Sequence, residues 1–375
     1  MFWCGKRQDW LCCFLFFAFG CLTLKGFFME QTMHLTFNGV AFKHLGLAMG
    51  FCVVLVGCGD NKPAQTQTDT KTQTAPTGEK NKPLEELIIA LDWVPNTNHT
   101  GLYVALENGY FKNQGFDVKI VQPSEDSAST LVANNRADLG VYFQPNMVKR
   151  LNKGEPIVAV ATIVQHNNAG LLSLKSLGAS TPKDLHGKRY STWEDPVDDA
   201  TVAEIVGEPL HKIPGESTDA TTALKMNQFD YILAYYSWDG IHAGLKGEPT
   251  NFFYLKDHNP DFDYYSPVLI ANTGKVGENP ERYKKALTAI KEGYTYSAQN
   301  PAQSAEILIK HAPETNKELA MASQEFMSKQ YLDDKGDWGK IDPVRWDKFF
   351  EWVNAKQLTD KPIEKGAGLN TTLLP

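Results

Sequence analysis

The sequence predicts an α/β protein with two lobes, each a mostly parallel sheet flanked by helices, followed by a helical C-terminal part. Short aliphatic runs alternate with segments of helical period from residue 84 onward, and a second alternation starts near residue 189. Beyond residue 280 the apolar residues recur almost wholly at helical spacing. A chain of 375 residues is also long enough to bury two cores.

Residues 84–174 carry the first alternation and are expected in lobe 1. Strands that take turns with helices favour a parallel sheet covered by helices. Such sheets bind ligands in the loops beyond the carboxyl ends of their strands, so a site is expected in those loops. The expected strands and helices lie at 87–91, 102–110, 116–120, 127–134, 139–142, 144–153, 157–163 and 171–174.

Residues 175–270 are expected to form lobe 2, and residues 271–375 to return to lobe 1. The C-terminal helical segments have a Pro near each start, as the first turn of a helix prefers. The expected strands lie at 189–191, 231–234 and 267–271. One expected helix ends at residue 206 and another starts at residue 238. The remaining expected helices cover 280–298, 302–311, 317–331 and 343–354.

The N-terminal region is expected to be a leader at residues 1–57 and a flexible linker at residues 58–83. Leu45–Gly57 is an apolar run that is too short to span a membrane comfortably and is typical of a signal peptide. Residues 1–32 add a second apolar run, which indicates an upstream extension or, alternatively, half of a membrane hairpin. The linker is polar and cannot bury apolar surface, so it is expected to act as a spacer.

The cysteines and the charge exclude several classes of function. All six Cys lie at or before Cys58, so the body of the protein cannot hold a disulfide, a zinc-thiolate site or a cysteine nucleophile. Lys and Arg number 37 against 44 Asp and Glu, a net charge of −7, so binding to nucleic acid is not expected. Cys58 ends a sequence that resembles a bacterial lipoprotein box, so a lipid on Cys58 is expected to tether the protein.

The loop between the first expected strand and helix, residues 92–101, is the most distinctive motif. Trp93, Asn96 and His99 lie in it, next to residues that can cap the helix. A helix N-terminus offers free N–H groups to a ligand, and loops at this sheet edge often carry function. A capping loop alone does not need this set of side chains, although a purely structural loop is the alternative.

Four segments resemble the lipoprotein binding subunits of ABC importers for pyrimidine precursors of thiamine, a thiamine pyrimidine synthase-like group of periplasmic binding proteins. They are 92–101, 187–190, 235–240 and 328–331, and the likeness covers about residues 87–375. The resemblance implies a type II periplasmic binding protein, whose two lobes close on ligand like a hinged clamp. It also implies a monomer without a cofactor, anchored at Cys58 in the periplasm or on the outer face of the cell membrane. The implied partners are an aminopyrimidine and the permease and ATPase subunits.

An aminopyrimidine is flat and carries both donors and acceptors, so its site needs aromatic faces and polar groups at the ring edge. Trp193 and Tyr236 could instead be core residues, Asp198 and Asp199 first-turn residues of a helix, and His99 a packed histidine. The candidates for stacking are Trp93, Trp193, Tyr236 and Trp238, and the candidates for the ring edge are Asn96, His99, Gln144, Asp198 and Asp199.

Two other functions remain open. Relatives of this fold include eukaryotic thiamine pyrimidine synthases, which use a lysine that holds pyridoxal phosphate, a nearby histidine and a cysteine-rich segment. By resemblance, the positions of that lysine and histidine fall on Tyr142 and Asn146. Tyr142 cannot form a Schiff base, and no catalytic motif is found, so an enzyme is not expected. A binding protein for a sulfonate, nitrate or another heterocycle is the other alternative. An anion would favour Arg or Lys, whereas the candidate loops carry aromatics and carboxylates. The segment 191–199 is more acidic than is usual in the family, which leaves the choice of ligand open.

Overall fold

The computed structural model describes residues 83–123, 127–215 and 219–374. The expected leader, the lipidation of Cys58 and nearly all of the expected linker therefore lie outside the described residues. Within the described ranges, no helix is both long and apolar enough to cross a membrane.

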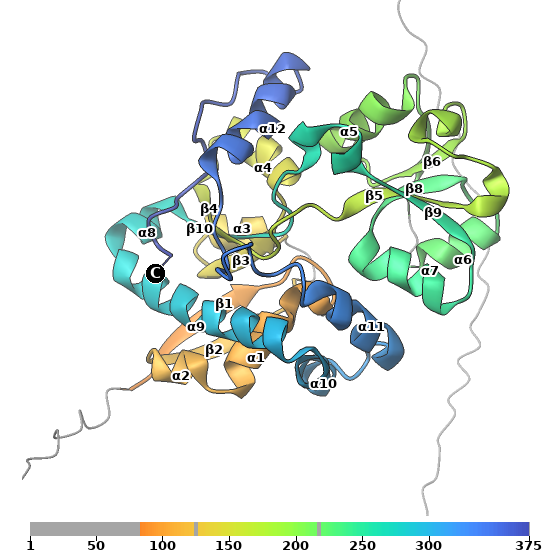
Figure 1. Cartoon of the computed structure of the whole chain (residues 1–375). Coiled ribbons are helices and arrows are strands. Elements are labelled where there is room, and N and C mark those ends of the chain that lie inside the picture. Colours follow the sequence, from red (N-terminus) through yellow and green to blue (C-terminus); the bar gives the residue numbers. More distant parts are fainter. Residues whose placement is uncertain (1–82, 124–126, 216–218, 375) are drawn as a thin grey trace, which may run out of the picture. The chain divides into compact units, whose positions relative to one another are not determined.

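The first lobe contains a five-stranded sheet with the strand order β2-β1-β3-β10-β4 (Figure 1). β1 is parallel to β2 and β3, whereas β10 is antiparallel to β3 and β4. Four strands thus run in one direction, and their carboxyl ends share one edge of the sheet. The strands are β1 (Glu85–Ala90), β2 (Phe116–Val121), β3 (Leu139–Tyr142), β4 (Ile157–Thr162) and β10 (Val268–Asn272).

The second lobe repeats this arrangement with the strand order β7-β6-β8-β5-β9. β6 is parallel to β7 and β8, and β5 is antiparallel to β8 and β9. The mostly parallel sheets that the sequence predicts are therefore present in both lobes, each with one reversed strand. The strands are β5 (Ala169–Leu174), β6 (Arg189–Thr192), β7 (His211–Pro214), β8 (Tyr231–Tyr235) and β9 (Thr250–Tyr254).

The two reversed strands lie wholly or mostly in a different lobe from the one that the sequence predicts. β5, expected in lobe 1, pairs within the second sheet, and β10, which begins before residue 271, pairs within the first. The chain passes between the lobes at residues 163–168 and returns at residues 263–267, just before β10. These two stretches are called the first and second crossing segments below.

The helices cover the sheets and add a C-terminal layer to the first lobe. α9 begins with a Pro at its first turn, as do α10 and α12, in agreement with the sequence prediction. The helices are α1 (Thr100–Glu107), α2 (Tyr110–Asn113), α3 (Ala128–Ala133), α4 (Gln144–Asn152), α5 (Pro196–Val206), α6 (Ala220–Lys225), α7 (Ile241–Leu245), α8 (Thr273–Glu278), α9 (Pro280–Gln299), α10 (Pro301–His311), α11 (Lys317–Met327) and α12 (Pro343–Ala355).

Two glycines let α9 approach α1 closely enough to fix the loop that precedes α1. A Cβ atom on Gly293 would lie 2.1 Å from the carbonyl oxygen of Gly101, and one on Gly101 would lie 2.3 Å from the ring of Tyr294. The Tyr294 hydroxyl donates to the carbonyl oxygen of Asn98 at 2.6 Å. The Tyr331 hydroxyl donates to the carbonyl oxygen of Thr97, also at 2.6 Å. The distinctive loop of the sequence is thus held by the C-terminal layer.

Candidate functional site

The sequence-predicted site residues all follow strands whose carboxyl ends lie at one edge of a sheet. Trp93, Asn96 and His99 follow β1, and Gln144 follows β3 in the first lobe. Trp193, Asp198 and Asp199 follow β6, and Tyr236 and Trp238 follow β8 in the second lobe. Because each crossing segment joins the two lobes at these edges, the four loops form one candidate site between the lobes.

In the loop after β1, the side chains of Asn96 and His99 form hydrogen bonds within the loop. The buried His99 ring accepts the backbone N–H of Asn96 on Nδ1 at 3.1 Å, which places the ring hydrogen on Nε2. Nε2 then donates to Oδ1 of Asp92 at 2.5 Å. The Asn96 side chain accepts from the Asn98 N–H and donates to the Val94 carbonyl oxygen. Both residues therefore shape the loop, and the group that they orient is Asp92.

Asp92 was not selected from the sequence, although it lies in the distinctive loop. Its side chain is only 4% exposed, and His99 is its hydrogen-bond partner. Asp92 also helps to raise the pKa of Tyr235 in the second lobe, so its charge acts across the space between the lobes. A His seven residues after an Asp in a strand–helix loop is the sequence signal that could have identified the pair.

The two tryptophans after β1 and β6 keep large exposed faces. Trp93 is 52% exposed and Trp193 is 46% exposed. Trp193 donates from its indole nitrogen to the Leu233 carbonyl oxygen at 3.0 Å, which fixes its ring on the second lobe. Both indoles thus present ring surface on which a flat ligand could stack, and their contact with a ligand stays a prediction.

Tyr236 packs in an aromatic cluster, and both Tyr236 and Trp238 are half-buried. The Tyr236 ring lies 5.3 Å from Phe252, 5.5 Å from Tyr254 and 5.2 Å from Phe326, between ring centroids. Phe326 belongs to α11 of the first lobe, so this cluster joins the two lobes. The arrangement favours the core alternative for Tyr236 over a ligand-facing role.

Gln144 is buried and bound at both ends of its carboxamide. Its Nε2 donates to the carbonyl oxygen of Trp346 at 2.9 Å, and its Oε1 accepts the backbone N–H of Tyr265 at 2.9 Å. These bonds tie α4 to α12 and to the second crossing segment. The arrangement supports a structural role for Gln144 and does not favour contact with a ligand.

An acidic cluster follows β6 at the start of α5. Asp195 caps the helix by accepting the N–H groups of Val197 and Asp198. It also accepts from Nδ2 of Asn146 in the first lobe at 3.1 Å. Asp199 is occupied by the Thr192 hydroxyl at 2.6 Å and by the ammonium of Lys212 at 3.1 Å. Asp195 therefore joins the lobes, and Asp199 is already paired.

Asp198 differs from its two acidic neighbours. Burial, together with the negative charges of Asp195 and Asp199, raises the pKa of Asp198 to about 8. The residue nevertheless keeps partial contact with solvent. Asp198 is thus a carboxyl group that holds its proton near neutral pH and that a cationic group would ionise.

Tyr235 lies where the charges of both lobes meet. Its ring lies over Phe143 of the first lobe, with centroids 6.2 Å apart, and its hydroxyl lies 3.2 Å from Oγ of Ser266. Burial raises the pKa of Tyr235, and the carboxylates of Asp198 and Asp92 raise it further. Carboxyl groups from both lobes therefore raise the pKa of the same tyrosine.

The first crossing segment and α11 add further contacts between the lobes. The Ser323 hydroxyl of α11 donates to the carbonyl oxygen of Ser237 at 2.5 Å and lies 2.6 Å from the Thr97 hydroxyl. The crossing segment holds two buried carboxamide nitrogens, on Gln165 and Asn168, that have no hydrogen-bond partner within the described residues. The lobes thus contact each other through hydrogen bonds. Within the described residues, the amide donors of Gln165 and Asn168 in the crossing segment stay unpaired.

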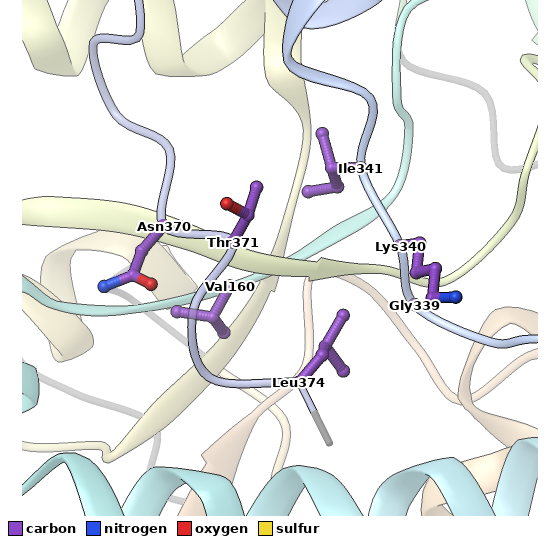
Figure 2. Close-up of a pocket in the computed structure, with 7 residues that line it drawn as sticks. All are labelled: Val160, Gly339, Lys340, Ile341, Asn370, Thr371 and Leu374. Atoms are coloured by element: carbon purple, nitrogen blue, oxygen red, sulfur yellow. The ribbon is translucent and has the colours of Figure 1, made fainter.

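Two cavities lie outside the region between the lobes. One, of about 250 Å³, lies in the first lobe between Val160 of β4, the segment 339–341 and the C-terminal segment near Leu374 (Figure 2). The other, of about 480 Å³, lies along α9 beside Tyr110. Neither contains a predicted site residue. Across the described ranges, no group of three or more His, Cys, Asp or Glu could hold a metal ion.

Comparison with known proteins agrees with this fold. The formylaminopyrimidine-binding protein of Halalkalibacterium halodurans is 27% identical over 301 residues, which cover 76% of this chain and 90% of that protein. The 4-amino-5-hydroxymethyl-2-methylpyrimidine phosphate synthase THI11 of Saccharomyces cerevisiae is 24% identical over 286 residues, which cover 68% of this chain and 81% of that protein.

Among solved structures, the alkanesulfonate-binding protein SsuA from Xanthomonas axonopodis pv. citri bound to MOPS matches with a TM-score of 0.59. It is 11% identical and covers 78% of this chain and all of its own, so it supports the periplasmic binding protein fold alone. Residues 96–304, more than half of the chain, match the family described as NMT1/THI5 like. The chain therefore belongs to the NMT1/THI5-like family.

Proposed function

We propose that this protein is the solute-binding subunit of an ABC importer, which captures an aminopyrimidine precursor of thiamine between its lobes and delivers it unchanged to a permease. The ligand class includes formylaminopyrimidine and hydroxymethylpyrimidine. The proposal includes a lipid anchor on Cys58 and a place in the periplasm or on the outer face of the cell membrane. A relative named for binding formylaminopyrimidine supports the ligand class.

The observation that carries the proposal is a pair of exposed indoles, Trp93 in the first lobe and Trp193 in the second, which follow strands whose carboxyl ends lie where the crossing segments join the lobes. Asp92 is oriented by His99 in the first lobe, and Asp198 lies in the second. Carboxyl oxygens accept hydrogen bonds from the exocyclic amine of an aminopyrimidine, and a ligand that binds both groups favours the closed arrangement. The exposed faces of Trp93 and Trp193 supply aromatic surface for a flat ring.

A sulfonate is a weaker candidate for this site. The loops 92–99, 143–146, 192–199 and 235–240 contain no Lys or Arg. An anion placed among them would meet carboxyl groups without a cationic partner, which is unfavourable when the lobes exclude water. The likeness to an alkanesulfonate-binding protein concerns the fold and does not change this reasoning.

A synthase is the second candidate function, because several relatives carry that name. The residues at the positions that resemble the essential lysine and histidine are engaged elsewhere. The Tyr142 hydroxyl accepts from Nε of Arg150 at 3.3 Å, and Asn146 donates to Asp195. Neither side chain can supply an amine nucleophile or an imidazole base, so we propose binding without catalysis.

Two measurements test the proposal. Mass spectrometry of small molecules released from freshly purified, denatured protein is expected to detect an aminopyrimidine, whereas a pyridoxal adduct would favour the synthase. Titration calorimetry is expected to show binding of formylaminopyrimidine or hydroxymethylpyrimidine and none of an alkanesulfonate.

Two matched variants test whether the ligand binds beside Trp93. Trp93→Ala is expected to weaken binding about tenfold through lost stacking and burial. Val94→Ala changes an exposed neighbour (44% against 52% for Trp93) and is expected to bind as the wild type does. Preference for the sulfonate, or equal binding by the two variants, would contradict the proposed site.

A further inference from the structure

Asn167 and Asn168 are neighbouring residues of the first crossing segment, and their buried carboxamides are bound very differently. Asn167 is fully engaged, since its Oδ1 accepts the N–H of Ala169 at 2.9 Å and its Nδ2 donates to the Phe262 carbonyl oxygen at 2.8 Å. Asn168 uses only its oxygen, which accepts the Ser237 hydroxyl at 3.0 Å and the Ser237 N–H at 3.4 Å. Within the described ranges, Nδ2 of Asn168 has no acceptor.

The orientation of the Asn168 carboxamide is fixed by its partner. A backbone N–H can only donate, so the atom that faces the Ser237 N–H must be the amide oxygen. The backbone adds a further constraint, because the Tyr236 N–H donates to the Asn168 carbonyl oxygen at 3.0 Å. The hydrogen bonds from Ser237 therefore hold the free Nδ2 group in a fixed orientation, and a preorganised donor loses little freedom on binding.

The position of Asn168 places this donor at the edge where the lobes meet. Asn168 directly precedes β5, and the next residue, Ala169, pairs with Tyr235 of β8. Tyr235 is the residue on which the carboxyl groups of Asp92 and Asp198 act. The carboxyl groups accept from a ligand, and an aminopyrimidine also carries acceptors that need a donor.

We propose that Asn168 is a specificity-determining residue that donates a hydrogen bond from Nδ2 to an acceptor atom of the bound ligand. In an aminopyrimidine that atom is a ring nitrogen or the formyl oxygen. The role rests on the proposed function, because it takes its ligand from there.

An unpaired buried donor is unfavourable, so a ligand that satisfies it gains affinity over an analogue that cannot. Asn168 is only 3% exposed in the present arrangement, in which Ser323 of α11 also binds Ser237. The ligand reaches the donor when α11 and Ser237 separate, and closing of the lobes then seals the hydrogen bond.

The test compares two matched substitutions by titration calorimetry at pH 9, where Asp198 is mainly ionised and cannot act as a donor. Asn168→Asp keeps the shape and the oxygen that Ser237 needs but removes the donor. It is expected to weaken binding of formylaminopyrimidine by about 10- to 100-fold. Asn167→Asp loses the bond to Phe262 and is expected to lower the melting temperature while the affinity stays within twofold of the wild type.

A second ligand identifies the acceptor. With the analogue that lacks the formyl group, Asn168→Asp is expected to match the wild type if the formyl oxygen is the acceptor, and to bind more weakly if a ring nitrogen is. Asn168→Ala serves as the second variant if the Asp variant does not fold, with the same expected loss.

Several outcomes would overturn the role of Asn168. Affinities of folded Asn168→Asp or Asn168→Ala within twofold of the wild type for both ligands would refute it and leave the proposed function standing. A wild-type protein that binds neither aminopyrimidine would refute the proposed function and, with it, the ligand assigned to Asn168.

Discussion

Asp198→Asn should change how the stability of the protein depends on pH. The pKa of Asp198 is raised from its ordinary value of 3.8 to about 8 in the folded protein. Between these values the folded state holds a proton that the unfolded state releases, so the wild type loses stability as pH rises from about 4 to about 8. The Asn variant carries no titrating group at this position and lacks this loss.

The magnitude follows from the shift and from exposure. Full conversion of the difference between 3.8 and about 8 gives roughly 6 kcal/mol. Because Asp198 keeps partial contact with solvent, we expect about 2–3 kcal/mol. The free energy of unfolding, measured by urea denaturation from pH 4 to pH 9, should therefore rise in the variant relative to the wild type by this amount across the range.

A neighbouring carboxyl group provides the control. Glu194→Gln removes an exposed carboxyl group from the same loop and should alter the free energy of unfolding by less than about 0.5 kcal/mol at every pH. Parallel curves for the wild type and Asp198→Asn across the whole range would refute the reasoning, because the carboxyl group would then ionise as it does in water.

Three further predictions follow from the packing and the hydrogen bonds. Gly293→Ala should lower the free energy of unfolding by about 1–3 kcal/mol, because α9 and α1 must separate, whereas Gly244→Ala, whose Cβ would meet nothing within 4 Å, should not. His99→Ala and Asp92→Asn should each weaken aminopyrimidine binding in calorimetry, and the double variant should lose no more than the larger single loss. Arg345→Met should lower the melting temperature by several degrees in differential scanning calorimetry, because this guanidinium joins both crossing segments; an unchanged temperature would contradict that role.

Arg345 is held between the crossing segments by one carboxyl group. Asp263 in the second crossing segment accepts from Nδ1 of His166 at 2.7 Å, from the N–H of Asn167 at 2.9 Å and from Arg345 at 2.9 Å. Burial alone would raise the pKa of Asp263, but these hydrogen bonds and the Arg345 charge lower it. The guanidinium also lies 3.9 Å from the centre of the Tyr265 ring.

The repeating pattern of the sequence predicts the fold class but not the pairing of every strand. The apolar runs of β5 and β10 look the same whether a strand is parallel or antiparallel to its neighbours. The sequence therefore does not show which sheet each strand joins, and the observed lobe boundaries differ from the predicted ones. β7 and β9 are not predicted at all. β7 is mostly exposed and β9 is half-buried throughout, so neither shows the buried run or the alternation that marks a strand.

The loops of the candidate site follow from the order of strands and helices, whereas the role of each side chain depends on distant partners. Gln144 is bound by backbone groups 121 and 202 residues away in the chain. Such partners leave no local pattern. The sequence therefore does not distinguish a polar side chain that contacts a ligand from one that holds a crossing segment in place. Asp92 is the converse, because its partner His99 lies within the same loop and the pair could have been recognised.

The C-terminal helices contribute contacts between the lobes. α11 binds Ser237 of the second lobe through Ser323, and α12 binds both crossing segments through Arg345. These contacts lower the free energy of the arrangement in which the lobes touch. A ligand shifts an equilibrium only by its differential affinity for the two states. Under the proposed function, these contacts contribute part of the free energy that favours the closed lobes, and the carboxyl groups and Asn168 add the part that selects the ligand.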